Sequence, residues 1–205
     1  MKNIFGIASL CMIIAVACTA DKRNNSVVNS KAGWDISIVP ASVRIDPLTG
    51  EIVENRFRGI ENRQYSYQQK RNWIYDGNKA LLYGARGEYI SFQVALNNYT
   101  DSTLRGLSIS MPSFHNRQME LGVKPEIFLE WFINIQTPST GYAKASLGKG
   151  WYPDALIPLE NIQYDSSKVH GRWIYPLWLP DFNNRIEGQR TLVFWVDQFI
   201  PFEAD

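Results

Sequence analysis

Hydrophobic and polar side chains alternate along several stretches of the chain beyond residue 33. The alternation is clearest in 89–97, 127–135 and 191–200, where apolar residues occupy every second position. Shorter stretches of the same kind are Ile36–Val39, Val43–Ile45 and Leu107–Met111. A period of two is typical of β-strands with one buried face, and no helical period is sustained after Gly33. The pattern therefore predicts an all-β protein.

Turn-forming residues separate these stretches. They are Pro47–Gly50, Asp76-Gly77, Asn97-Asn98 and Asn183-Asn184. Antiparallel strands with one polar face commonly pack as two sheets. We therefore predict a two-sheet antiparallel β-sandwich over 34–205. Residues 138–190, rich in Pro, Gly, Trp and Tyr, are predicted to form a long irregular loop, and ordered loops of that length are often functional.

The first 33 residues have a different character. Residues 4–17 are apolar or small and follow a single charged residue, Lys2, which is typical of a signal peptide. The small residue Ala17 precedes Cys18 and resembles a bacterial lipobox, which predicts lipidation of Cys18 after removal of residues 1–17. An ordinary cleaved signal with an incidental cysteine remains the alternative. Residues 18–33 are polar and are predicted to be a tether.

Cysteine usage and charge limit the possible compartments and partners. The only other cysteine, Cys11, lies within the predicted leader, so the body has no disulfide. We expect an exported, cell-envelope protein attached to the membrane through its lipid alone. Lys and Arg number 21 against 20 Asp and Glu, and this balance argues against a nucleic-acid partner.

Candidate catalytic groups are sparse. His115 and His170 have no metal-ligand partner at a suitable spacing, and we expect no metal and no cofactor. Neither a Gly-X-Ser-X-Gly elbow nor a phosphate-binding glycine loop is present. Glycosidases work with paired carboxyl groups, but no two acidic residues are adjacent in this sequence. The carboxylates that we considered, Glu88, Glu130, Asp154 and Asp197, are each better explained by structural roles.

Three motifs in order resemble a known family. They are Ala85–Val94 (ARGEYISFQV), Trp151–Leu159 (WYPDALIPL) and Phe194–Asp197 (FWVD), the last followed by Ile200-Pro201. This order is similar to the N-terminal region of glycoside hydrolase family 123 and related uncharacterised bacterial lipoproteins, over roughly Val43–Asp205.

The resemblance implies an N-terminal β-sandwich followed by a (β/α)8 barrel that removes β-linked N-acetylgalactosamine with an adjacent Asp-Glu pair. This sequence contains neither the pair nor the barrel, so we assign no catalytic residue and expect no enzymatic activity from this chain alone. The chain ends soon after its last predicted strand, so we expect an open sheet edge or an exposed apolar face. We interpret the chain as a truncated or split product, with a self-sufficient variant as the alternative.

Three functions remain open. The first is an accessory module that packs against a catalytic barrel, with Trp151, Tyr152 and Asp154 as the barrel- or glycan-facing residues. The second is a free-standing glycan-binding lipoprotein, and the third is a vestigial structural fragment. Exposure of the aromatic residues, which make up 13% of the chain, would favour the second over a purely structural role. The aromatic candidates are Trp73, Tyr75, Trp151, Tyr152, Trp173 and Tyr175.

Overall fold

The computed structural model describes residues 7–10, 33–56, 71–111, 114–116, 119–137, 147–162 and 175–204. The all-β prediction is confirmed for these residues, whose only helices are two short 3-10 turns, η1 (Val53–Arg56) and η3 (Leu159–Asn161). The longer strands are β2 (Trp34–Pro40), β4 (Tyr89–Asn98), β7 (Glu126–Ile135), β8 (Gly150–Pro158) and β9 (Thr191–Phe199). The shorter strands are β1 (Ile7–Leu10), β3 (Ala80–Tyr83), β5 (His115–Asn116) and β6 (Met119–Glu120).

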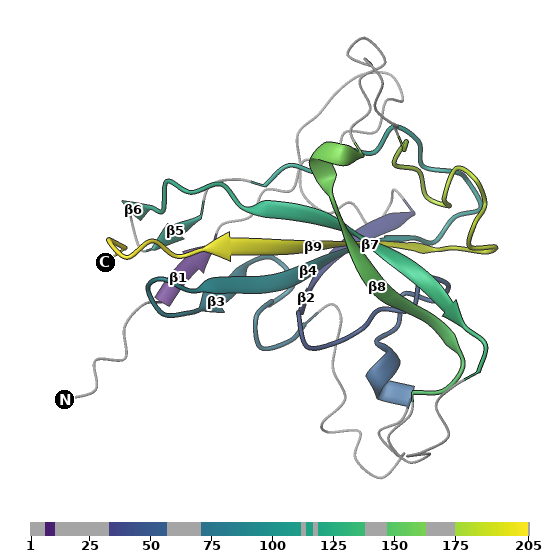
Figure 1. Ribbon diagram of the computed structural model, residues 1–205, viewed down its shortest axis with the longest axis horizontal. Coiled ribbons are helices and arrows are strands. Elements are labelled where there is room, and N and C mark those ends of the chain that lie inside the picture. Colours follow the sequence, from purple (N-terminus) through teal and green to yellow (C-terminus); the bar gives the residue numbers. More distant parts are fainter. Residues whose placement is uncertain are drawn as a thin grey trace.

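The five longer strands form one antiparallel sheet in the order β2-β4-β9-β7-β8 (Figure 1). The last strand, β9, lies inside the sheet and pairs with β4 along its whole length and with β7 over Glu126–Leu129. The last strand is therefore not an edge of this sheet, whose edges are β2 and β8. Beyond this sheet, the described residues contain two two-stranded pairs, β1-β3 and β5-β6.

Two predicted short strands are not strands. Ile45 makes only an isolated bridge to Ile52, because Asp46 Oδ1 accepts hydrogen bonds from the N–H groups of Leu48 and Thr49 and closes a tight turn. The 107–111 segment has no ladder, although the Leu107 N–H donates to the Leu177 carbonyl at 3.0 Å. Both segments bury apolar side chains against the sheet without joining it, and their hydrophobic pattern alone suggested strands.

Two turn and loop predictions also need correction. Asn97 and Asn98 belong to β4, and the turn begins at Asn98, whose side-chain Nδ2 donates to the Ser102 carbonyl at 2.7 Å. The predicted irregular stretch 138–190 contains the nine-residue strand β8. An edge strand tolerates proline, which cannot donate to a ladder, so Pro153 does not interrupt β8. The register shifts here, and Asp154 is the extra residue of a β-bulge between Pro153 and Ala155.

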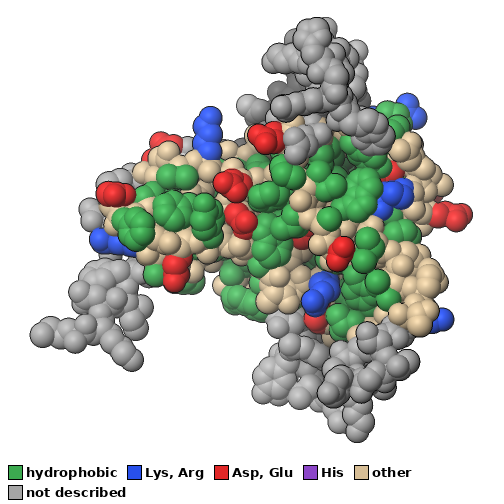
Figure 2. Space-filling view, viewed as in Figure 1, with side chains coloured by type: hydrophobic (Ala, Val, Ile, Leu, Met, Phe, Trp, Pro, Cys, Tyr) green, Lys and Arg blue, Asp and Glu red, His purple; other side chains and the backbone are tan. Residues whose placement is uncertain are grey.

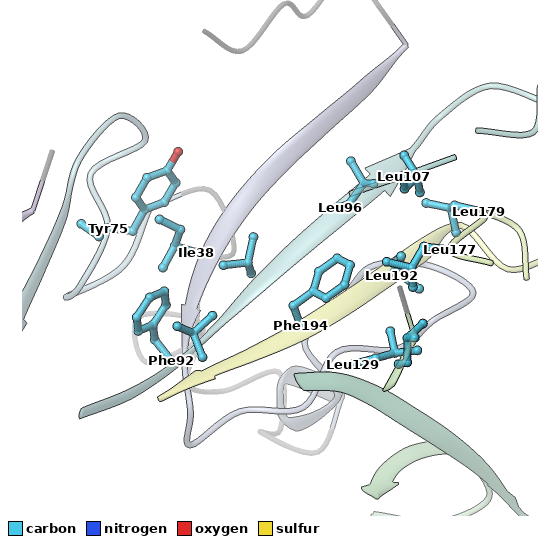
Figure 3. Packing of buried hydrophobic residues seen from close by; sticks show 14 of the residues in the cluster. Ile38, Tyr75, Phe92, Leu96, Leu107, Leu129, Leu177, Leu179, Leu192 and Phe194 are labelled. Atoms are coloured by element: carbon cyan, nitrogen blue, oxygen red, sulfur yellow. The ribbon is translucent and has the colours of Figure 1, made fainter. Parts of the chain in front are cut away.

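The sheet carries an apolar cluster on each face. The larger cluster lies on what we call the main face, where Leu107, Leu177 and Leu179 from irregular segments pack beside strand residues Leu96 and Leu192 (Figure 3). The smaller cluster lies on the opposite, second face, where Val43, Ile45 and Ile52 pack with Val193 and with other side chains. The sheet is therefore covered on its main face and on part of its second face.

Strand β1 falls within the predicted leader. Its backbone pairs antiparallel with β3, from Ile7 opposite Tyr83 to Leu10 opposite Ala80. This pairing does not test cleavage of residues 1–17, which stays a prediction, and the tether 18–33 lies outside the described residues except for Gly33. Within the described ranges, no helix has the length and apolar character needed to cross a bilayer.

Candidate functional site

One half of the second face is open to solvent. Gln93 marks the boundary, because its side chain is buried and its Nε2 donates to the carbonyls of Pro40 (3.0 Å) and Val43 (2.7 Å). Beyond Gln93, towards the start of β4 and the end of β9, the side chains on this face are half-buried or exposed. We call this surface the open half-face, and its residues are Tyr89, Ser91, Glu126, Phe128, Trp195, Asp197, Phe199 and Phe202.

The strand register orders these side chains in three rows. In the outer row, Tyr89 lies opposite Phe199. In the middle row, Asp197 has Ser91 on one side and Glu126 on the other. In the inner row, Trp195 lies opposite Phe128. Residues two apart on a strand share a face and lie about 7 Å apart, so a polar row separates two aromatic rows that are about 14 Å apart.

Asp197 is fixed by two neighbours. Its Oδ1 accepts hydrogen bonds from Ser91 Oγ (2.5 Å) and from Trp195 Nε1 (2.6 Å). No described residue donates to its other oxygen, Oδ2. Because the indole N–H and the carboxylate hold each other, both the plane of the Trp195 ring and the direction of the Asp197 carboxylate are set before any ligand arrives.

The aromatic rings of the outer row continue past the end of β9. The ring centroids of Tyr89 and Phe199 are 5.1 Å apart, and those of Phe199 and Phe202 are 6.3 Å apart. Tyr89 is 59% exposed and Phe202 is 69% exposed. Figure 2 shows hydrophobic side chains gathered at the end of the molecule where the C-terminus lies, with acidic and basic side chains beside them.

The open half-face carries negative charge only. Asp197 and Glu126 occupy directly opposite positions on β9 and β7, and none of the eight residues is a cation. Like charges directly opposite on neighbouring strands destabilise a sheet. The two hydrogen bonds to Asp197 offset part of this cost, and the two carboxylates place hydrogen-bond acceptors between the aromatic rows.

The three residues predicted to face a barrel or a glycan do not form one surface. Trp151, Tyr152 and Asp154 all lie on β8, where neighbouring side chains point to opposite faces. Trp151 packs against the second-face cluster. The Tyr152 hydroxyl donates towards the carbonyls of Leu147 (2.7 Å) and Gly148 (3.1 Å), and Asp154 is exposed at the bulge.

The other aromatic candidates are also dispersed. Tyr75 and Tyr175 are buried in the main-face cluster, and Trp73 is 58% exposed. Trp173 lies outside the described residues. Of the described members of these six rings, only Trp73 is exposed, so the exposure that would favour the glycan-binding hypothesis is not found at these positions.

The candidate carboxylates have separate roles. Glu88 Oε2 accepts from the Ala85 N–H at 3.2 Å, which stabilises the turn before β4. Glu130 is buried on β7, and its Oε2 has no hydrogen-bond partner among the described residues. Burial raises the pKa of the Glu130 carboxyl from its ordinary value of 4.5 to about 8, so this group is largely protonated at neutral pH.

No metal centre is formed by the described residues, which contain no cluster of three or more His, Cys, Asp or Glu side chains. His115 lies in the short strand β5, and His170 lies outside the described ranges. His115, the histidine within the described residues, does not belong to the open half-face.

The open half-face was not predicted from the sequence, although its signal is present there. The strands at 89–97, 127–135 and 191–200 were assigned one buried face from their apolar positions. On the opposite face, the sequence places Tyr89, Phe128 and Trp195 among polar residues. Aromatic residues on the predicted polar face of neighbouring strands were the informative feature.

Comparison with known proteins adds no family assignment. Neither protein-family models nor curated protein sequences give a match to this chain.

Proposed function

We propose that this chain is a non-catalytic β-sandwich module of an exported, lipid-anchored protein of the glycan-degrading type, and that it acts by binding through the open half-face. The observation that carries this proposal is the exposure of Tyr89 and Phe202 next to half-buried aromatic rings and a fixed carboxylate on one sheet face. Contiguous exposed apolar surface marks interaction sites on soluble domains.

The sandwich in this proposal has an irregular second layer. The segments over the main face are extended, and the N–H and carbonyl groups of Leu104 and Leu179 exchange hydrogen bonds of 2.8 and 2.9 Å in an isolated bridge. Strand β3 also contributes Leu82 to the same cluster. These segments cover the main face as a second sheet would, and the open half-face on the other side remains free for a partner.

The resemblance to glycoside hydrolase family 123 supports the proposal at particular positions. Tyr89 and Ser91 lie in the first motif, and Trp195 and Asp197 lie in the third, so two motifs that are distant in sequence meet on the open half-face. Hydrolysis in this proposal belongs to a separate catalytic barrel, and this chain contributes contact. A free-standing glycan-binding role would use the same surface.

Photo-crosslinking in cells that produce the protein tests this function. In the first variant, benzoylphenylalanine replaces Phe202, which is exposed on the open half-face. In the matched control variant it replaces Tyr99, which is 56% exposed and follows the last residue of β4, at the opposite end of that strand from Tyr89. We expect irradiation to join the Phe202 variant to a glycan or to a glycan-degrading enzyme, and the Tyr99 variant to neither.

Equal labelling of both positions, or no adduct from Phe202, would show that the open half-face has no specific contact in the cell. Release of nitrophenol from 4-nitrophenyl β-N-acetylgalactosaminide by the purified protein would separately contradict the non-catalytic role.

A further inference from the structure

We propose that the open half-face is a binding site for a neutral oligosaccharide, which stacks on its aromatic rows and donates hydroxyl hydrogen bonds to Asp197 and Glu126. This inference rests on the proposed function, because it assumes that the open half-face is a contact surface, and it specifies the occupant.

The aromatic rings provide the apolar part of such a site. Flat rings pack against the C–H faces of pyranose rings, and a ring held in one orientation loses little conformational freedom on binding. Trp195 is held by its hydrogen bond to Asp197, and Phe199 is held between Tyr89 and Phe202. Both platforms are therefore ordered in the free protein.

The polar row provides acceptors for sugar hydroxyl groups. Asp197 Oδ1 already accepts two hydrogen bonds, and Oδ2 is left to accept a third from a ligand. Hydrogen bonds that involve an ionised acceptor are roughly twice as strong as neutral ones. Among the eight residues of the open half-face, the charged ones are Asp197 and Glu126, which lie opposite each other, so a sulfated or carboxylated glycan would be repelled.

The same carboxylates disfavour an apolar protein domain as the occupant. A domain packed on this face would remove both carboxylates from water, and burial of a charge without a partner is very costly. A glycan lying along the surface leaves the carboxylates in contact with its hydroxyl groups and with water. The observations therefore favour a sugar chain over a dry protein interface.

The length of the site favours an oligosaccharide. The inner row at Trp195 and the outer row at Phe199 are about 14 Å apart, which is longer than a single pyranose ring. A monosaccharide can reach only one aromatic row together with the polar row. A trisaccharide can contact both rows, and we expect it to bind more tightly.

Calorimetric titration of the intact protein tests the inference. The probes are neutral trisaccharides of glucose, mannose, galactose, N-acetylglucosamine and N-acetylgalactosamine, the corresponding monosaccharides, and sulfated forms of the same trisaccharides. We expect at least one neutral trisaccharide to bind, and its sulfated form and its monosaccharide each to bind about tenfold more weakly or worse, which corresponds to ~1.4 kcal/mol.

Variants locate the site. We expect Trp195→Ala to weaken binding of that trisaccharide about tenfold or more. Tyr89→Ala, which removes an exposed ring, should weaken binding measurably in a protein that still unfolds cooperatively. Trp73→Ala removes an exposed ring outside the open half-face and should leave the affinity unchanged. Asp197→Asn should reduce the discrimination against the sulfated form, because it removes one of the two opposed charges.

Each outcome separates the two proposals. If no neutral trisaccharide binds while Phe202 still crosslinks in cells, the glycan assignment is wrong and the contact function stands. If a trisaccharide binds but Trp195→Ala and Tyr89→Ala bind as the unaltered protein does, the site lies elsewhere and the inference is overturned. If neither binding nor crosslinking occurs, both proposals are wrong.

Discussion

Glu130 shows how a single residue can oppose the stability of the sheet that contains it. Its side chain is 3% exposed, it lies two residues from Phe128 on the same face of β7, and its Oε2 has no described partner. Desolvation favours the protonated form, which explains the pKa of about 8. The folded protein is therefore more stable when the Glu130 carboxyl group is protonated than when it is ionised.

The pH dependence of unfolding tests this property. Between pH 4.5 and about pH 8 the folded state holds a proton on Glu130 that the unfolded state loses, so the free energy of unfolding falls as the pH rises through this range. The slope contributed by one group is at most about 1.4 kcal/mol per pH unit. The neutral variant Glu130→Gln should match the unaltered protein near pH 5 and be the more stable by on the order of a few kcal/mol at pH 9.

Glu187→Gln is the matched control, because Glu187 is exposed outside the open half-face and its replacement also removes one formal negative charge. Denaturant unfolding of the three proteins at several pH values measures the effect. Parallel stability curves for the Glu130→Gln variant and the unaltered protein would refute the description of Glu130 as a buried, unpartnered acid.

The turn before β4 is the element that fixes the outer aromatic row. The Gly87 N–H donates to the Ile200 carbonyl and the Ile200 N–H donates to the Glu88 carbonyl, each at 2.8 Å. Gly87 has a φ of +77°, and a Cβ at this position would lie 2.4 Å from Cε1 of the Phe202 ring. Glycine is therefore required both for the backbone conformation and for the placement of Phe202.

Two glycine substitutions separate these requirements. Gly188 also has a positive φ, of +73°, but a Cβ at this position would have no atom within 4 Å. Gly188→Ala should therefore lower the free energy of unfolding by about 1–2 kcal/mol through backbone strain alone. Gly87→Ala also displaces the exposed Phe202 ring, and we expect a further loss of roughly 0.5–1.5 kcal/mol from the weakened contact between Phe202 and Phe199. Thermal or denaturant unfolding measures both, and equal losses would show that Phe202 does not pack on this turn.

At the element level, the sequence predicted strands best where alternation was long. The 89–97, 127–135 and 191–200 stretches became β4, β7 and β9 with bounds within one or two residues. Strand β8 was missed because Pro153 and Pro158 argue against a strand, and only tertiary structure shows that β8 is an edge. Val43–Ile45 was overpredicted because a buried turn and a short strand share the same apolar pattern.

At the scale of the whole molecule, a single five-stranded sheet is covered on its main face and only partly on its second face. The open half-face could not be assembled from the sequence, because it depends on the register that places Trp195 opposite Phe128 and Asp197 opposite Glu126. The sequence shows the aromatic and acidic residues separately. Only strand pairing shows that they are neighbours.

The predicted lipid attachment at Cys18 can be tested by substituting each of the two cysteines. We expect a fatty-acid analogue supplied to producing bacteria to label the protein at Cys18, and the mature mass to begin at that residue. Cys18→Ser should abolish the label, whereas Cys11→Ser, in the predicted leader, should keep it. A label that persists in the Cys18→Ser variant, or a mature protein that retains residues 1–17, would contradict the lipoprotein prediction.

The exposure of the open half-face is tested most directly by hydroxyl-radical footprinting of the purified protein. We predict that Tyr89 and Phe202 are oxidised at rates similar to that of the exposed control Tyr99, and that the buried rings Phe92 and Phe132 are nearly inert. Oxidation of Tyr89 and Phe202 as slow as that of Phe92 would show that this face is covered. Both the contact function and the glycan site would then be contradicted.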